Sequence, residues 1–203
     1  MKIFGHPMST CTRKVLTTLA ETHTPYELVL VDFAKNEHKQ EPHLSRQPFG
    51  QIPALDDDGF ALYESRAICR YVNEKAKGSL MANDLRGRAV VEQWISIETS
   101  NFSAHAMKFI YQYVFKREVD PTVLEQASQS YDKALGIMDA QLAKNAFIAG
   151  PTFTIADICY MPYLEYTLAT PAKEIASKHA NVMAWWGKLS ERPSWQKVTG
   201  RGT

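Results

Sequence analysis

The pattern of apolar and polar positions changes its period along the first part of the chain. Residues 2–4 form a short apolar run that Gly5 ends, and apolar residues then recur at helical spacing over residues 11–21. Residues 26–31, which read YELVLV, follow Pro25 and are rich in β-forming types. Because a helix separates the two strands, we expect them to pair in parallel as a βαβ unit.

The segment after residue 50 predicts a β-hairpin and a helix. Two apolar runs, residues 52–55 and 60–63, flank the sequence DDDG, whose Asp-Gly pair favours a tight turn because it tolerates positive φ. Apolar residues at helical spacing then predict a helix that ends near residue 76, and the polar segment 36–44 predicts one or two irregular helical turns. Residues 1–77 therefore follow the order βαβ, then ββα.

The remaining pattern is helical, so we expect an all-helical second domain over residues 84–203. Asp120, followed by proline, predicts a helix start, because aspartate is a good N-cap and proline fits the first helical position. A second start is predicted at Thr154, whose side chain can form a capping box with Asp157. The last helix is expected to stop at the Arg-Pro pair that ends with Pro193.

The composition is that of an ordinary globular protein, and the low net charge favours a small, nearly neutral partner. Of its 203 residues, 45% are hydrophobic and 22% are charged, and the formal net charge is +1. The basic excess of a nucleic-acid-binding protein is missing, and no apolar stretch approaches the roughly 18 residues that span a bilayer. Three scattered cysteines suit neither a disulfide framework nor a zinc site. We therefore expect a cytoplasmic protein without metal, nucleic-acid or membrane binding.

Ile52 and Pro53 form the strongest single signal for a binding site. Proline at the start of a strand cannot donate to the ladder, and a cis peptide bond there would turn the backbone N–H and C=O of Ile52 outward. Such an open edge can pair with an extended peptide. An edge strand that merely tolerates proline explains the same residues equally well.

Two further pairs of residues could bind anions. Glu64 and Ser65 open the helix after the hairpin, where free N–H groups and the helix dipole favour a carboxylate. An ordinary helix cap is the commoner use of such a serine. His38 and Lys39 could hold a second carboxylate, although a solvated run of charges explains them as well. Each of these signals is weak alone.

Taken together, the motifs resemble those of glutathione transferases. The similar segments are EHK (37–39), PFGQIPAL (48–55), YESRAICRY (63–71), FTIAD (153–157) and AWW…ERPSWQKV (184–198). With the opening HPMST, they look most like the phi class known from plants. The resemblance spans nearly the whole chain. It implies a glutathione transferase fold: an α/β thioredoxin-like glutathione-binding domain with a cis-proline over residues 1–77, and an all-α domain over residues 84–203 that forms the electrophile pocket.

The resemblance also implies a role for each site residue. Glutathione would be the co-substrate, and the Ser9 hydroxyl would hydrogen-bond its sulfur. The tripeptide backbone would pair with Ile52 before cis-Pro53. The two ends of glutathione would be held by the matching polar residues: Glu64 and Ser65 at the γ-glutamyl end, and Gln51, His38 and Lys39 at the peptide and its glycyl carboxylate.

Cys11 is the alternative reactive group in the stretch HPMSTCT. In cysteine-type relatives of this superfamily the thiol forms a mixed disulfide with glutathione, which would make the protein a thiol-transferase. Ser9 occupies the position that the resemblance assigns to catalysis. We therefore expect Cys11 to be a small buried residue, and we expect Cys69 and Cys159 to lie in the core.

The expected activity is transfer of glutathione to apolar electrophiles, with reduction of organic hydroperoxides as a further use of the same thiolate. The electrophile pocket is expected among apolar side chains that core packing explains equally well: Met8, Phe33, Tyr111 and Phe115. Like its relatives, the protein would be a homodimer, with Phe49 inserted into the partner subunit. A non-catalytic ligand-binding protein of the same fold is the other alternative.

Overall fold

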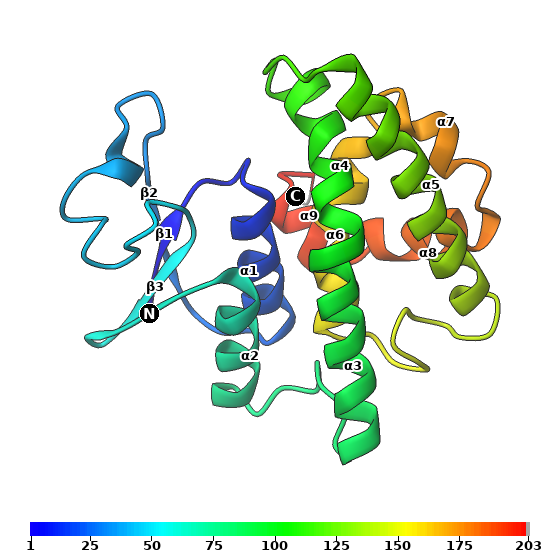
Figure 1. The fold of residues 1–203 in the computed structure, drawn as a ribbon. Helices are drawn as coiled ribbons and strands as arrows, with labels where there is room; N and C mark the ends of the chain where they lie inside the picture. Colours follow the sequence, from blue (N-terminus) through cyan, green and yellow to red (C-terminus); the bar gives the residue numbers. More distant parts are fainter. Residues whose placement is uncertain (202–203) are drawn as a thin grey trace. The chain divides into compact units, whose positions relative to one another are not determined.

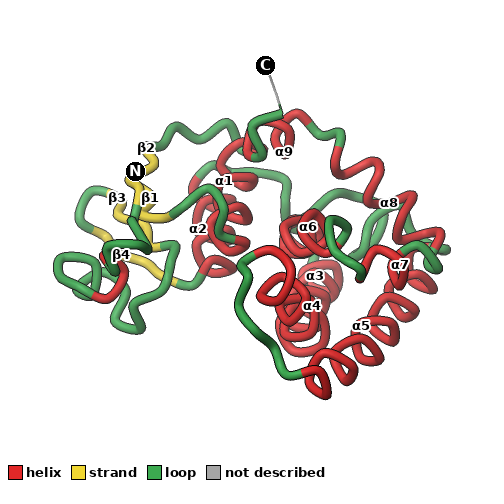
Figure 2. Tube along the Cα trace, turned by 90° about the horizontal axis from the view of Figure 1, so that it is seen from above, coloured by secondary structure: helices red, strands yellow, loops and turns green. Residues whose placement is uncertain are grey.

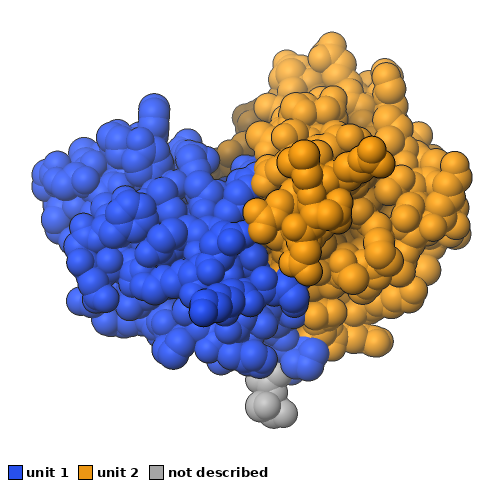
Figure 3. All heavy atoms as spheres, turned by 90° about the horizontal axis from the view of Figure 1, so that it is seen from below, with its two compact units in different colours: residues 1–79, 193–203 blue, residues 80–192 orange. Residues whose placement is uncertain are grey.

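The computed structural model describes residues 1–201. Its contacts divide the chain into two compact units, which Figure 3 shows in different colours. The first unit contains Met1–Ser79 and the segment that begins at Pro193, and the second contains Leu80–Arg192. Within the described residues, none of the helices has the length and apolar character that crossing a membrane requires.

The first unit is built on a four-stranded sheet with the order β2-β1-β3-β4 (Figure 1). β1 (Lys2–Gly5) and β2 (Glu27–Leu30) are parallel and are connected by α1 (Thr10–Glu21), which confirms the predicted βαβ unit. β3 (Ala54–Asp57) pairs antiparallel with β1 and with β4 (Phe60–Tyr63). The hairpin is therefore also confirmed.

The register of the sheet brings four connections to one end of it. Gly5, the last residue of β1, lies opposite Leu30, the last residue of β2. Ala54, the first residue of β3, lies opposite Phe4 and also opposite Tyr63, the last residue of β4. The loops that follow β1, β2 and β4 and the loop that precedes β3 therefore leave the sheet at the same end.

Two helices cover the sheet and bury an apolar face. α1 packs against α2 (Ser65–Lys75), as Figure 2 shows, and the segment between β2 and β3 contains only the short helix η1 (Glu37–Lys39). Cys69 is fully buried in α2, as predicted. Burial raises the pKa of this thiol to about 11, so it stays protonated at neutral pH.

A short helix, α9 (Pro193–Val198), follows the point at which we predicted the last helix to stop. Proline fits the first position of a helix as well as the position after one, and here it begins a new turn. Trp195 is fully buried, and the Arg13 guanidinium lies 6.0 Å from the centre of its ring. Because α9 packs against α1, it groups with the first unit and not with the expected helical domain, whose expected end at residue 203 lies outside the described residues.

The second unit is helical, as predicted. Among its described residues the one extended pairing outside a helix is a bridge between Phe147 and Gly150. A long helical segment passes through two π-helical turns, and separate helices follow it (Figures 1 and 2). In chain order the elements are α3 (Leu85–Ile97), η2 (Glu98–Ser103), α4 (Ala104–Phe109), η3 (Ile110–Val114), α5 (Pro121–Leu142), α6 (Ile155–Thr167), α7 (Ala172–Ala176) and α8 (Ala180–Ser190).

Both predicted helix starts in this unit are confirmed. Asp120 caps α5, and Asp157 forms the capping box with Thr154 at the start of α6. The fully buried Asp157 carboxylate also accepts the N–H of Ile148 at 2.9 Å and the indole N–H of Trp185 at 3.0 Å. Burial raises the pKa of Asp157 to about 6, and these hydrogen bonds act against the rise.

Candidate functional site

Ser9 lies at the N-terminus of α1, where the chain leaves β1. It is the N-cap residue, and its Oγ accepts the backbone N–H of Thr12 at 3.2 Å. A hydroxyl that accepts one hydrogen bond still has its own proton to donate. The half-buried Ser9 can therefore present an O–H donor at the positive end of the α1 dipole.

The loop before Ser9 is held by side chains that the sequence did not single out. Nε of Arg13 donates to the carbonyl of Pro7 at 2.8 Å, and its terminal nitrogen lies 3.8 Å from the sulfur of Met8. The Nδ1 atom of His6 accepts the N–H of Met8 at 3.1 Å. Met8 is 45% exposed beside Ser9, so the structure places this predicted pocket residue on the surface of the loop.

Cys11 differs from the prediction. We expected a buried residue, but Cys11 is half-buried in the first turn of α1. Thr10 and Thr12 on either side of it are buried, so Cys11 lies on the more exposed face of this first turn. Cys69 and Cys159 are fully buried, as predicted.

His38 and Lys39 lie in η1, on the connection that follows β2. The Nζ atom of Lys39 donates to the carbonyl of Phe49 at 2.9 Å, which ties η1 to the loop that leads to β3. The ring of His38 packs on Phe33 with 4.3 Å between centroids, and Phe33 in turn meets the ring of His6 at 6.5 Å. Phe33 is 43% exposed, so this predicted pocket residue lies between two imidazoles at the surface.

The loop before β3 carries Gln51 and the expected peptide-binding residues. The peptide bond between Ile52 and Pro53 is cis, as predicted, and the ladder of β3 begins only at Ala54. The N–H of Gln51 donates to the Oε1 atom of Gln47 at 3.2 Å. Its carbonyl lies 2.7 Å from the Nε2 atom of His43. His43 and Gln47 could not be found from the sequence, because their partners are backbone groups, which leave no pattern of side chains.

Glu64 and Ser65 lie where β4 passes into α2. Glu64 has a φ of +71°, and its side chain does not cap the helix. A non-glycine residue held at such a φ costs about 1–3 kcal/mol, and strain of this kind clusters at functional sites. Ser65 is the first residue of α2 and is buried, so a hydroxyl and the free N–H groups of a helix start occur together.

The first unit thus gathers its predicted site residues at one end of the sheet. Ser9 follows β1, His38 and Lys39 follow β2, residues 51–53 precede β3, and residues 64–65 follow β4. The register places all four connections at that end. The arrangement combines a hydroxyl donor, a backbone edge, a cation and a helix N-terminus.

The other two predicted pocket residues, Tyr111 and Phe115, belong to the second unit. Their ring centroids are 6.3 Å apart at the end of η3, and Phe115 also meets Tyr166 at 6.1 Å. The Arg117 guanidinium lies 5.4 Å from the ring centre of Tyr111. Phe115 is 36% exposed, so these rings form an aromatic cluster with an open side.

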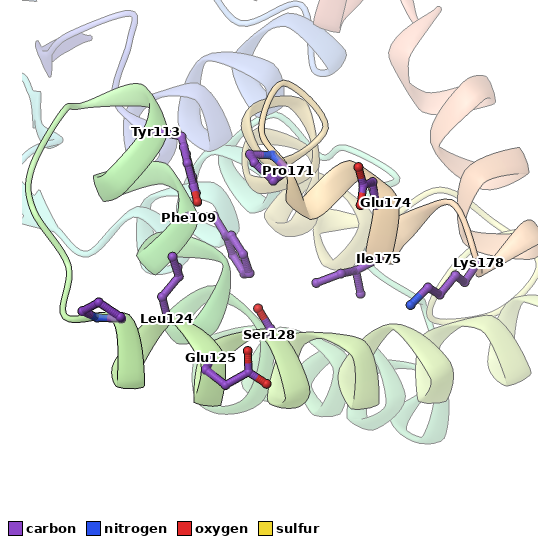
Figure 4. A pocket seen from close by; sticks show the side chains of 10 residues that line it. Phe109, Tyr113, Leu124, Glu125, Ser128, Pro171, Glu174, Ile175 and Lys178 are labelled. Carbon is purple, nitrogen blue, oxygen red and sulfur yellow. The ribbon is translucent and has the colours of Figure 1, made fainter.

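The second unit also contains a cavity of about 370 Å³ that the sequence did not predict. Figure 4 shows Phe109, Ser128 and Ile175 pointing into the space between α5, α7 and the end of the long helix. The complete lining is Phe109, Tyr113, Pro121, Leu124, Glu125, Ser128, Pro171, Glu174, Ile175 and Lys178. It has no thiol or imidazole, so it offers apolar surface and a charged rim but no nucleophile.

Across the part of the chain that the structure describes, no three His, Cys, Asp or Glu side chains are grouped so that they could hold a metal ion.

Comparisons with known proteins agree on one family. Residues 1–74 match the model of the glutathione S-transferase N-terminal domain, and residues 102–193 match that of the C-terminal domain. Glutathione S-transferase F11 from Arabidopsis thaliana is 34% identical over 206 residues, which cover 98% of this chain and 96% of the relative.

Solved structures agree with this match over the full length. Glutathione transferase F7 from Populus trichocarpa superposes with a TM-score of 0.93 at 36% identity, covering 100% of this chain and 99% of that one. Glutathione S-transferase I from maize, solved in complex with an atrazine glutathione conjugate, has a TM-score of 0.91 at 35% identity, covering 98% and 96%.

Proposed function

The chain belongs to the glutathione S-transferase family, and we propose that it activates glutathione through the Ser9 hydroxyl and transfers it to apolar electrophiles. One observation carries the serine assignment. The Oγ atom of Ser9 accepts the N–H of Thr12 at the start of α1, which leaves the hydroxyl proton for an anionic acceptor. An accepted hydrogen bond also polarises the hydroxyl and makes it a better donor.

The energy that such a donor supplies is sufficient for the task. A free thiol has a pKa of about 8.5, and only its thiolate is a good nucleophile. Lowering that pKa by about 2 units requires about 2.7 kcal/mol of preferential stabilisation of the thiolate. A hydrogen bond to a charged group contributes about 1.5–3 kcal/mol, and a helix N-terminus adds about 0.3–1 kcal/mol. Ser9 therefore acts as a donor and keeps its own proton.

The remaining residues at the sheet end orient glutathione. Ile52 precedes the β3 ladder, so its backbone suits pairing with the tripeptide. Glu64, with Ser65 at the N-terminus of α2, suits the γ-glutamyl end, which carries an ammonium and a carboxylate. At the glycyl carboxylate we assign the remaining polar residues: His38, Lys39 and Gln51.

The transfer step requires no further group from the protein. The thiolate sulfur attacks an electrophilic carbon, a C–S bond forms, and the leaving group departs with its electron pair while the thiol proton has passed to solvent. With an organic hydroperoxide the thiolate attacks oxygen instead and the O–O bond breaks. A second glutathione then yields glutathione disulfide, so the peroxide is reduced to alcohol and water.

We assign the electrophile to the apolar residues that the resemblance to glutathione transferases suggests, two from each unit: Met8, Phe33, Tyr111 and Phe115. Their half-exposed rings and thioether suit the lining of a small-molecule site, which is mostly apolar. The range of accepted electrophiles would follow from the shape of this lining, because a methylene in such a pocket changes binding by about 1–3 kcal/mol.

The test is conjugation of glutathione to a chlorinated nitrobenzene by wild type, Ser9→Ala and Cys11→Ser across pH. We expect Ser9→Ala to lose about 10- to 150-fold in kcat/KM near neutral pH, because a hydrogen bond to a charge is lost. The loss should shrink as pH approaches the pKa of the free thiol. Cys11→Ser is the matched control and should stay near wild type.

Cys11 gives the second candidate function, because it is half-buried and not enclosed in the core. A thiol-transferase would reduce mixed disulfides of glutathione by forming a mixed disulfide at its own cysteine. That activity would survive Ser9→Ala and disappear in Cys11→Ser, the reverse of the transferase result. Wild type that binds glutathione but performs neither reaction would support a ligand-binding protein of the same fold.

We also propose a cytoplasmic homodimer with a role in detoxification. None of the cysteines in the described residues forms a disulfide, which suits a reducing compartment. Phe49 is 66% exposed, with its ring 6.2 Å from Tyr63, and a large exposed ring suits insertion into a partner subunit. A solution mass near twice 23.0 kDa, falling to one chain in Phe49→Ser, is the expected result.

A further inference from the structure

The side chain of His43 is buried in the loop before β3 and bonds to backbone. It is 4% exposed, and its Nε2 atom lies 2.7 Å from the carbonyl oxygen of Gln51. A carbonyl only accepts, so Nε2 must carry the proton and act as donor. The Nδ1 atom is buried without a hydrogen-bond partner among the described residues. The proton on Nε2 is therefore directed at the carbonyl of Gln51.

Gln47 completes the attachment from the other side. It is 1% exposed, and its Oε1 atom accepts the N–H of Gln51 at 3.2 Å. Both backbone polar groups of Gln51 are thus held by buried side chains, although the Gln51 side chain itself is exposed. These side-chain hydrogen bonds satisfy the backbone N–H and C=O of Gln51, as the ladder hydrogen bonds do within a strand.

The hydrogen bond from His43 also fixes the residue after Gln51. The carbonyl of Gln51 and the N–H of Ile52 belong to one planar peptide unit, in which the two groups point in opposite directions. Holding the carbonyl toward His43 therefore aims the N–H of Ile52 away from it. Because the ladder of β3 begins at Ala54, that N–H precedes the strand pairing of the sheet.

We propose that His43 is a positioning residue for glutathione: it holds the Gln51 carbonyl so that the Ile52 N–H faces the backbone of the co-substrate. This inference rests on the proposed function and names a residue of the same site. The hydrogen bond polarises the shared peptide unit and so strengthens the Ile52 N–H as a donor.

The hydrogen bond from His43 stabilises the loop, but the unpartnered Nδ1 atom offsets part of that gain. A buried nitrogen without a partner is unfavourable, and a phenylalanine would fill the same flat space without one. What the imidazole adds is one donor at the Gln51 carbonyl. The advantage is therefore expected in the affinity for glutathione.

The test compares His43→Phe, which keeps a buried ring and removes the donor, with His43→Gln, whose amide N–H₂ reaches a similar distance. We expect the Kd and KM for glutathione to rise about 3- to 12-fold in His43→Phe, the equivalent of one net hydrogen bond. The KM for the electrophile and kcat should stay within about twofold, because the hydrogen bond acts on the bound tripeptide. His43→Gln should recover most of the affinity.

The possible outcomes separate the two proposals. If wild type neither binds nor conjugates glutathione, the proposed function is wrong. If wild type does both, and a folded His43→Phe binds glutathione within twofold of wild type, His43 does not position it. If the KM values for glutathione and for the electrophile rose equally, the role of His43 would be purely structural and the proposal would be wrong.

A measurement on wild type covers the case in which His43→Phe does not fold. The ¹⁵N spectrum of the His43 ring should show a proton on Nε2, and the signal of the Ile52 amide should shift when glutathione is added. The proposal would be overturned by a ring that carries its proton on Nδ1 and not on Nε2. It would also be overturned if the signal of the Ile52 amide did not change at saturating glutathione.

Discussion

Polar side chains hold the backbone in two regions of the molecule, with different consequences. At the sheet end of the first unit, Gln47 and His43 hold the backbone of the exposed Gln51 through an amide and an imidazole. At the start of α6 in the second unit, Asp157 holds the backbone inside the core through a carboxylate. The first arrangement holds a loop of the proposed glutathione site, and the second joins one segment of the core to another.

The difference in charge follows from the surroundings. At the sheet end, the proposed glutathione site has its cationic side chain in Lys39, whose Nζ atom bonds to the carbonyl of Phe49. In the core a carboxylate can accept several hydrogen bonds at once, but burial makes its charged form unfavourable. The raised pKa of Asp157, about 6, is the result. We therefore expect Asp157 in the second region to make stability depend on pH.

The largest effect is expected from Asp157→Ala, which removes the acceptor for the N–H of Ile148, Thr154 and Trp185. Leaving these donors buried and unpaired should lower the free energy of unfolding by about 3–5 kcal/mol, measured by urea denaturation. Asp157→Asn keeps one carbonyl acceptor and should lose less. A loss below about 1 kcal/mol in Asp157→Ala would contradict the comparison, as would a changed glutathione affinity in the protein that remains folded.

The pH dependence of stability sharpens the same point. The pKa of Asp157 is raised from 3.8 to about 6 in the folded protein, so the folded state binds the proton more tightly. The stability that this proton binding contributes is fully present below the pKa of Asp157 in the unfolded chain, and it is lost as the pH rises through about 6. Between pH 4.5 and pH 7, wild type should lose about 2 kcal/mol relative to Asp157→Asn. A constant difference between the two proteins would show that Asp157 is charged throughout.

The sequence predicted those parts of the molecule that depend on neighbouring residues. The strands, the hairpin and both helix starts follow from local patterns of apolar residues and caps, as at Thr154 and Asp157. Ser9 and Ile52 could be proposed as site residues because they lie in motifs with a recognisable order. His43 and Arg13 could not, because each acts on a backbone carbonyl and no side-chain pattern records that contact. The exposure of Cys11 likewise could not be predicted, because it depends on which face of the first turn of α1 the rest of the unit covers.

A smaller effect is expected from Gly5→Ala, which tests how closely the sheet end is fitted to α1. A Cβ at Gly5 would lie 2.7 Å from the Oγ1 atom of Thr12, whose N–H bonds to Ser9. Overpacking of this kind costs about 1–3 kcal/mol, and here it should also displace Ser9 and reduce kcat. Thr12→Ala in the same chain removes the clash and should restore part of both, as measured by thermal unfolding and conjugation. If the double variant regained neither stability nor activity, a contact other than the one with Thr12 would account for the effect of Gly5→Ala.

The smallest effect is expected at a buried hydrogen-bonded pair without charge, in the same unit as Asp157. Tyr131 and Thr167 form a neutral hydrogen-bonded pair, 2.8 Å apart and fully buried, in the same unit as Asp157. Burial raises the pKa of Tyr131 further above its ordinary range, so the pair stays neutral at any ordinary pH. Tyr131→Phe should therefore cost about 1 kcal/mol of unfolding free energy, and the same amount at pH 5 and pH 8. A cost that changed with pH would show that the helical core itself, and not the carboxylate of Asp157, makes stability sensitive to protons.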